Sequence, residues 1–197
     1  MPEAYADVLR SELDRIQLQI ASATQTKLVR FCEELDRWNR RINLTGLSGV
    51  DLVRRLVVEP IWIGDHLQMT GTLVDIGSGN GSPAIPLALT CAFEKTHLVE
   101  ARTRRSAFLR QMLTVLQVPG EVHRARFEDA IAELPAADWI TLQAVHPTEA
   151  LLAAMKRISK PNTAVAWITS TSTAWPQGLR IQTPFPATQV ILLNASC

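Results

Sequence analysis

The feature that most restricts the fold of this chain is an apolar run that ends in three closely spaced glycines. Residues 72–76 read Thr-Leu-Val-Asp-Ile, and Gly77, Gly79 and Gly81 follow at alternate positions. Glycine lets the backbone turn sharply and lets a ligand approach without meeting a Cβ atom. The pattern therefore predicts a buried strand that leads directly into a ligand-binding loop.

An acidic residue follows this loop at an informative distance. The next β-rich run ends at Glu100, nineteen residues after Gly81. Without the glycine loop before it, Glu100 would be interpreted as a solvent-exposed acid at the end of a strand. After a glycine loop, an acid at the tip of the second strand is placed to accept hydrogen bonds from both hydroxyls of a ribose. The pair predicts a nucleoside-containing ligand.

The hydrophobic pattern changes near residue 70. Apolar residues before this point have helical spacing, which predicts helices over 6–22, 26–43 and 49–67, the last kinked or divided at Pro60. β-rich runs follow at 72–76, 96–100, 121–125, 139–145 and 164–169. They alternate with helical segments at 83–91, 102–116, 127–134 and 147–159. We expect an α/β fold with a doubly wound, mostly parallel sheet and an N-terminal helical extension. Two further runs, 179–182 and 189–193, suit an antiparallel edge.

We therefore divide the chain into an N-terminal helical subdomain, residues 1–70, and a ligand-binding domain, residues 71–197. The composition, 47% hydrophobic and 20% charged, is typical of a soluble globular protein. The acidic N-terminus lacks a secretory pattern and no apolar run approaches the roughly 20 residues of a membrane span, so we expect a cytoplasmic location. Cys32, Cys91 and Cys197 are far apart, which predicts neither disulfides nor a metal site.

Two adenosine cofactors compete for the loop. The dinucleotide fingerprint G-x-G-x-x-G/A fits from Gly79 to Ala84 only with Pro83 inside it. Pro83 and Pro86 remove N–H groups that the pyrophosphate of NAD requires. S-adenosylmethionine has no phosphate, and Asp75 is available for its ammonium group. The sequence favours S-adenosylmethionine over hydride transfer with NAD.

Four segments together resemble one protein family: residues 38–45 (Trp-Asn-Arg-Arg-Ile-Asn-Leu-Thr), 73–88 around the glycine loop, 98–101 and 105–109. They are similar to the bacterial small-subunit ribosomal RNA methyltransferase G family, also called glucose-inhibited division protein B. The likeness extends from about residue 28 to residue 169. It implies a Rossmann-like class I methyltransferase fold.

The resemblance implies methyl transfer from S-adenosylmethionine to N7 of a guanine in 16S rRNA, with 16S rRNA or the 30S subunit as partner. It places the loop against the methionine and ribose, Glu100 against the ribose, and Phe127 and Glu128 against the adenine. The expected cofactor-binding residues are Asp75, Gly77, Gly79, Gly81, Ser82, Glu100, Phe127, Glu128 and Gln143. Guanine N7 carries a lone pair and no proton, so attack needs alignment rather than a general base. We therefore expect no catalytic triad and treat His66, His97, His123 and His146 as structural or surface residues.

Arginines form two groups that suit RNA. Residues 101–126 contain six arginines against one acid, and three more lie at positions 37, 40 and 41. The expected RNA-binding residues are Arg40, Arg41, Arg55, Arg104 and Arg105. Two other interpretations remain open: a solvated helix face, and arginines that complement a helix dipole.

The chain departs from the family pattern at several positions. Leu56 replaces a histidine, Gln143 an arginine and Thr169-Ser170 a Lys-Gly pair, and Ser82 and Ala84 stand where the family has Phe or Leu and Gly. The changes cluster on the substrate side more than on the cofactor side. Those at Leu56, Gln143 and Thr169 favour an alternative, a diverged methyltransferase acting on a small molecule or a protein. A second alternative is a cofactor-binding RNA assembly factor without catalysis. We expect a monomer that binds no metal.

Overall fold

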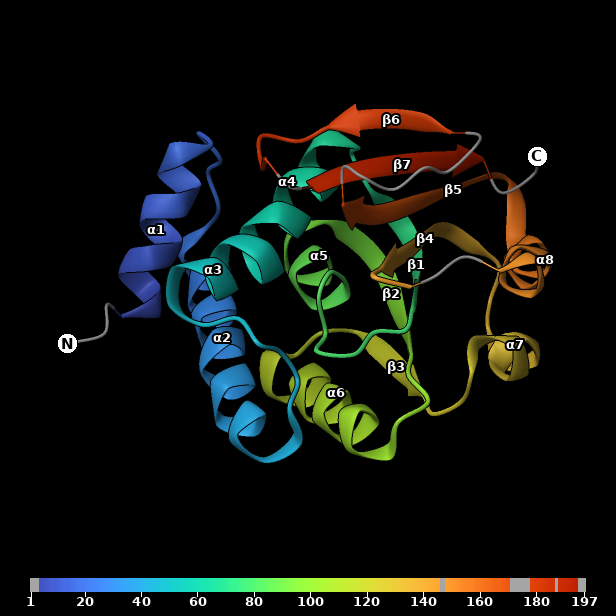
Figure 1. The fold of residues 1–197 in the computed structure, drawn as a ribbon, viewed down its shortest axis with the longest axis horizontal. Helices are drawn as coiled ribbons and strands as arrows, with labels where there is room; N and C mark the ends of the chain where they lie inside the picture. The colour runs from blue at the N-terminus through green and yellow to red at the C-terminus, as the bar shows by residue number, and fades with distance from the viewer. Residues whose placement is uncertain (1–3, 146–147, 171–177, 187, 195–197) are drawn as a thin grey trace.

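A computed structural model describes residues 4–145, 148–170, 178–186 and 188–194. Within this part, the strands form a single seven-stranded sheet in the order β3-β2-β1-β4-β5-β7-β6 (Figure 1). The strands are β1 (Thr70–Ile76), β2 (Ala92–Val99), β3 (Gly120–His123), β4 (Ala137–Gln143), β5 (Ser159–Ser170), β6 (Leu179–Gln182) and β7 (Thr188–Asn194). The predicted strands are all present. Most begin earlier than predicted, and those expected to end at residues 100, 125 and 145 end at residues 99, 123 and 143.

The sheet is parallel from β3 to β5, and β7 runs antiparallel to both β5 and β6. The predicted antiparallel edge is therefore confirmed. Strand β1 lies between β2 and β4. The chain adds β2 and β3 on one side of β1 and then crosses to the other side, where it adds β4 and the remaining strands. In a doubly wound sheet, ligands bind at the carboxyl ends of the strands beside such a switch point.

Helices cover both faces of the sheet (Figure 1). One face packs against the N-terminal helices together with α5 (Ala84–Thr90) and α6 (Thr103–Leu116). The other packs against α7 (Phe127–Ala130) and α8 (Glu149–Arg157). Neighbouring residues of β1 point to opposite faces of the sheet. Leu73 belongs to the hydrophobic cluster on the face of the N-terminal helices, α5 and α6, and Val74 to the cluster on the face of α7 and α8.

The N-terminal helices differ in detail from the prediction. They are α1 (Tyr5–Arg15), α2 (Ser22–Ile42), α3 (Gly49–Val53), the π-helical turn η1 (Arg54–Val58) and α4 (Glu59–His66). The expected helix over 6–22 is too long, because Gln17 adopts a left-handed backbone with φ 56° and the chain then leaves the helix. The predicted disruption at Pro60 is confirmed. Proline cannot donate to the carbonyl four residues earlier, and a π-helical turn precedes it.

Two other predictions need qualification. The helix expected over 127–134 is one short turn, α7, followed by the 3₁₀ turn η2 (Ile131–Glu133). The division of the chain at residue 70 stays a prediction. No helix within the described residues is both long and apolar enough for a membrane span. Cys32 is buried and Cys91 half-buried, both as free thiols, whereas Cys197 lies outside the described residues.

Candidate functional site

The glycine loop connects β1 to α5 and folds back onto the end of β2. The backbone N–H groups of Gly77 and Ser78 donate to the carbonyl of Val99 at 2.9 and 3.0 Å. Gly77 has φ +73°, and a Cβ there would lie 3.0 Å from Cγ2 of Val145. A side chain at this position would therefore be strained and crowded where the loop turns.

Glu100 fixes the loop from the neighbouring strand. Its Oε2 accepts a hydrogen bond from the backbone N–H of Gly79 at 3.0 Å, and its Oε1 accepts one from the N–H of Arg102 at 2.7 Å. The residue is only 7% exposed. The acid predicted to hold a ribose thus also ties the loop to the end of β2.

Two cavities adjoin this loop at the carboxyl ends of the strands. The first has a volume of about 560 Å³ and lies between the loop, the N-terminal helices and the ends of β4, β5 and β7. The second, about 260 Å³, lies between the ends of β1 and β2, the segment 125–128 and the start of α8. Gly77 and Val145 line both. The cavities therefore flank the switch point, where a ligand is expected.

The predicted cofactor-binding residues divide between these cavities. The first is lined by Gly77, Gly79, Ser82 and Gln143. The second is lined by Gly77, Glu100, Phe127 and Glu128. Gly81 and Asp75 line neither cavity. A Cβ on Gly81 would lie 2.6 Å from Cδ1 of Ile85, so this glycine permits close packing of the loop against α5.

Asp75 lies beneath the loop and is 1% exposed. Its Oδ1 accepts a hydrogen bond from the hydroxyl of Thr141 at 2.6 Å, whereas Oδ2 has no partner within the described residues. Burial raises the pKa of Asp75 to about 6, the charge of Glu100 adds to this effect, and the Thr141 bond opposes it. Sequence reasoning missed Thr141, because its pairing with Asp75 depends on the parallel register of β1 and β4.

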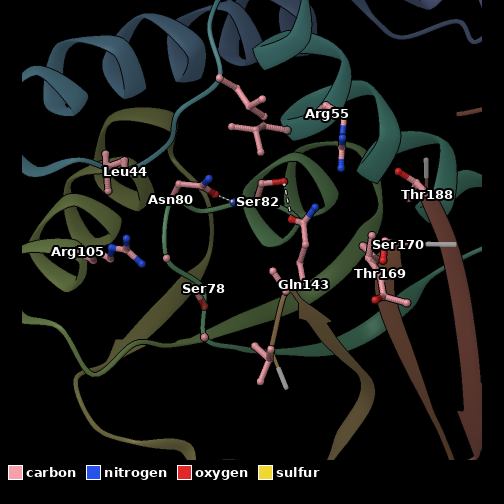
Figure 2. A pocket seen from close by; sticks show the side chains of 17 residues that line it. Leu44, Arg55, Ser78, Asn80, Ser82, Arg105, Gln143, Thr169, Ser170 and Thr188 are labelled. Carbon is pink, nitrogen blue, oxygen red and sulfur yellow. Dashed lines mark hydrogen bonds between the residues drawn. The ribbon is translucent and has the colours of Figure 1, made fainter. Parts of the chain in front are cut away.

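Gln143 ends β4 and faces the loop. In Figure 2 its side chain lies opposite Ser82, whose hydroxyl donates to Gln143 Oε1 at 3.3 Å. The backbone N–H of Ser82 in turn donates to Oδ1 of Asn80 at 3.0 Å. Polar side chains thus connect the loop with the adjacent strand end across the floor of the first cavity.

Two of the five predicted RNA-binding arginines, Arg55 and Arg105, line the first cavity from different elements (Figure 2). Arg55 lies on η1, and its Nε is 3.4 Å from Oε1 of buried Glu59. Burial raises the pKa of Glu59, and the charge of Arg55 opposes the increase. The other three, Arg40, Arg41 and Arg104, are exposed and line neither cavity.

The histidines lie apart from this cleft where they are described. His66 stacks on Trp62 with ring centroids 4.6 Å apart. His97 and His123 are almost fully buried, on β2 and β3. Neither cavity has any of these three in its lining. His146 lies outside the described residues.

The sequence profile of one family, rRNA small subunit methyltransferase G, matches residues 24–174 of the chain. The chain belongs to this family. The match includes the whole glycine loop, Glu100 and Gln143, and it confirms the resemblance stated above.

Curated relatives in the methyltransferase G family agree. A ribosomal RNA small subunit methyltransferase G of Sinorhizobium medicae is 34% identical over 139 residues, which are 68% of this chain and 65% of the relative. The corresponding protein of Granulibacter bethesdensis is 35% identical over 150 residues, 74% of this chain and 68% of that protein. The chain thus spans slightly less than two thirds of the first relative.

Solved structures show the same architecture at low identity. A Klebsiella pneumoniae protein assigned as an O-methyltransferase matches with a TM-score of 0.64 and 13% identity over 98% of both chains. A precorrin-6y C5,15-methyltransferase of Geobacter metallireducens matches with a TM-score of 0.54 and 13% identity over 76% of this chain and 89% of that one. The predicted Rossmann-like class I methyltransferase fold is confirmed.

Three of the departures from the methyltransferase G pattern lie in one place. Leu56, Gln143 and Thr169 all line the first cavity, although they come from η1, β4 and β5. Each is an uncharged side chain. Among the described residues, the wall opposite the glycine loop is therefore neutral apart from Arg55.

Proposed function

We propose that this chain is a methyltransferase that uses S-adenosylmethionine to methylate N7 of a guanine in 16S rRNA. The observation that carries the proposal is the pair of cavities that meet at Gly77 on the β1–β4 switch point. One provides a nucleoside site and the other leaves room for an acceptor. Membership in the methyltransferase G family supports this activity.

The residues of the second cavity fit an adenosine group. Val99 and Phe127 offer apolar surface for a purine, and Glu100 offers a buried carboxylate for ribose hydroxyls. Gly77 leaves the turn between the cavities free of a side chain. Bound S-adenosylmethionine would supply an electrophilic methyl group on its sulfonium. Asp75 lines neither cavity, so its carboxylate, buried beneath the loop with one oxygen unpartnered within the described residues, would favour the ammonium group of the cofactor by its charge rather than by direct contact.

The first cavity suits a base that has left its stack. Its volume of about 560 Å³ admits a purine, and beside the loop the Gln143 amide offers a hydrogen-bond donor and the Ser82 hydroxyl oxygen an acceptor. Enzymes that modify bases hold the extruded base by such contacts. Because guanine N7 carries a lone pair and no proton, the protein would need to align the base rather than to deprotonate it.

Arg55 and Arg105 would then contact the phosphates nearest the base, and exposed Arg40, Arg41 and Arg104 would contact those farther away. Phosphate contacts position the protein on RNA and make its affinity dependent on salt. We propose that the protein acts in the cytoplasm on 16S rRNA or on the 30S subunit.

One observation favours a second candidate. The neutral wall formed by Leu56, Gln143 and Thr169 also suits a small uncharged substrate. Such an enzyme would bind S-adenosylmethionine equally well but would not depend on the arginines.

The deciding experiment uses 30S particles and free 16S rRNA from a strain that lacks the protein. Purified protein and labelled S-adenosylmethionine should give one N7-methylguanine, located by nuclease digestion and mass spectrometry. Calorimetry with S-adenosylhomocysteine and NAD should show binding of the first alone. Cofactor binding without transfer to either RNA would favour the second candidate, and preferential NAD binding would refute both.

A further inference from the structure

A second group of chemically competent side chains lies at the edge of the sheet, away from the cofactor cleft. In the parallel pairing of β2 with β3, His97 is opposite Glu121 and Val99 is opposite His123. Since side chains alternate along a strand, His97, Glu121 and His123 point to the same face. Val99 places this face on the side of α7 and α8, because it belongs to the hydrophobic cluster of those helices.

The two imidazoles have the spacing of metal ligands. Nδ1 of His97 is 3.1 Å from Nε2 of His123, and the rings are stacked with centroids 5.3 Å apart. Zinc binds imidazole nitrogen at about 2.0–2.1 Å, so neighbouring nitrogens in a tetrahedral site are about 3.3 Å apart. His97 is 4% and His123 9% exposed, which restricts both rings to this arrangement.

Glu121 supplies a carboxylate within reach. Its Oε2 lies 4.0 Å from His97 Nδ1 and 3.9 Å from His123 Nε2, and the three ligand atoms all lie within 4.8 Å of one another. Lys95 binds the other oxygen, Oε1, at 2.6 Å. The Glu121 side chain is 53% exposed, so it can make the movement of about 0.6–0.7 Å that coordination of the same ion requires.

A metal ion binds the neutral form of histidine, so each ring must present an unprotonated nitrogen to the ion. Glu133 Oε2 lies 3.6 Å from Nδ1 of His123. A small movement of exposed Glu133 would bring its carboxylate within hydrogen-bond reach of Nδ1, as in carboxylate–histidine–metal arrangements, and would leave the lone pair of Nε2 directed at His97.

We propose that His97, His123 and Glu121 bind one divalent transition-metal ion such as Zn²⁺, with water completing the coordination. The ion would join the four-residue edge strand β3 to β2. It would also steady the segment 125–128, which begins two residues after His123 and lines the second cavity. The site is independent of the proposed methyl transfer.

The test measures Zn²⁺ binding to the full chain, without a histidine tag, by calorimetry at pH 7.5. We expect one ion per chain and a Zn²⁺-dependent rise in Tm. H97Q and H123Q should each weaken binding by more than about 100-fold, and E133Q, which removes only the carboxylate behind His123, by about 10-fold. His66→Gln is the matched control, because His66 is exposed and should leave the affinity unchanged.

Co²⁺ gives a second readout that does not depend on the buried variants folding. Four-coordinate Co²⁺ bound by nitrogen and oxygen ligands has stronger visible absorption than six-coordinate Co²⁺. Glu121 lies on the surface, so Glu121→Gln should leave the chain folded while it weakens both this absorption and the Zn²⁺ affinity. Absence of binding at millimolar Zn²⁺ would overturn the proposal and leave an N–H···N hydrogen bond between the two rings. Affinity unchanged in folded H123Q or in E121Q would place the ion elsewhere and overturn it equally.

Discussion

Glu100 accepts a hydrogen bond from the backbone N–H of Gly79 at 3.0 Å, so the acid at the end of β2 directly holds the loop that follows β1. The two residues are 21 positions apart in the sequence, and the parallel pairing of β1 with β2 brings them together. Glu100 therefore has two proposed effects: it shapes the loop before ligand binding, and it offers its carboxylate to a ribose.

Replacing Glu100 tests both effects. Glu100→Ala should weaken S-adenosylhomocysteine binding by about 1.5–3 kcal/mol, since it removes charge-assisted hydrogen bonds. It should also lower Tm, because the N–H groups of Gly79 and Arg102 lose their acceptor. Calorimetry and thermal unfolding measure the two effects. Glu94→Ala removes an exposed acid on β2, the strand that Glu100 directly follows; it is the control and should change neither. Unchanged cofactor affinity in Glu100→Ala would remove this residue from the proposed site.

Asp75 should make the stability of the ligand-free protein fall as the pH rises. Its pKa is about 6 in the folded protein and has an ordinary value of 3.8, so between these values the folded state holds the proton and the unfolded state does not. The free energy of unfolding therefore decreases through this window. Asp75→Asn should match the wild type near pH 4 and exceed it by up to about 3 kcal/mol above pH 7.

Urea unfolding at a series of pH values measures this difference. Asp138→Asn provides a control of opposite sign. The hydrogen bond from Lys160 lowers the pKa of Asp138, so its charge stabilises the folded state above its ordinary pKa, and the variant should lose stability relative to wild type as the pH rises. Parallel stability curves for wild type and Asp75→Asn would contradict the prediction.

The chemical step should vary little with pH. Guanine N7 has no proton to lose, and the described residues that line the first cavity include no histidine, cysteine or lysine. Single-turnover methyl transfer should therefore be nearly constant between about pH 6.5 and 8.5, once RNA binding has been measured separately. A tenfold rise per pH unit would instead require a general base at the site.

Gln143→Arg tests which substrate the first cavity accepts. An arginine there would pair with a phosphate or with the O6/N7 edge of guanine. For an rRNA methyltransferase, RNA affinity should rise, and the slope of log K against log salt should steepen by roughly 0.7–0.9, the value of one phosphate contact. Cofactor affinity should stay the same. For a small uncharged substrate, the new cation would be unpaired in the cavity and activity should fall.

Filter binding to 16S rRNA at several salt concentrations gives the slope. Ser11→Arg adds the same charge to an exposed position on α1, outside both cavities, and controls for a general increase in basicity. An equal effect of both variants, or no effect of Gln143→Arg, would show that position 143 does not face RNA.

The strand–glycine loop–helix unit, the acid nineteen residues later, the alternation of strands and helices and the family could all be predicted from the sequence. These features are local, or they depend on spacings that parallel pairing fixes. The sequence also indicated that Leu56, Gln143 and Thr169 lie on the substrate side of the site, but it did not show that all three line one cavity. Residues from three elements become neighbours only when the N-terminal helices pack beside the sheet.

Tertiary structure alone decided the remaining features. Thr141 meets Asp75, and His97 meets His123, through strand register, which depends on side-chain packing over the whole sheet. The sequence suggested structural or surface histidines because nothing near either residue in the chain indicated the other. Likewise, the end of α1 at Arg15 follows from the left-handed turn at Gln17, although Ile20 continues the apolar spacing of a helix. The hydrophobic periodicity of the sequence indicates which residues are buried, whereas only the packing of the folded chain determines which buried residues contact one another.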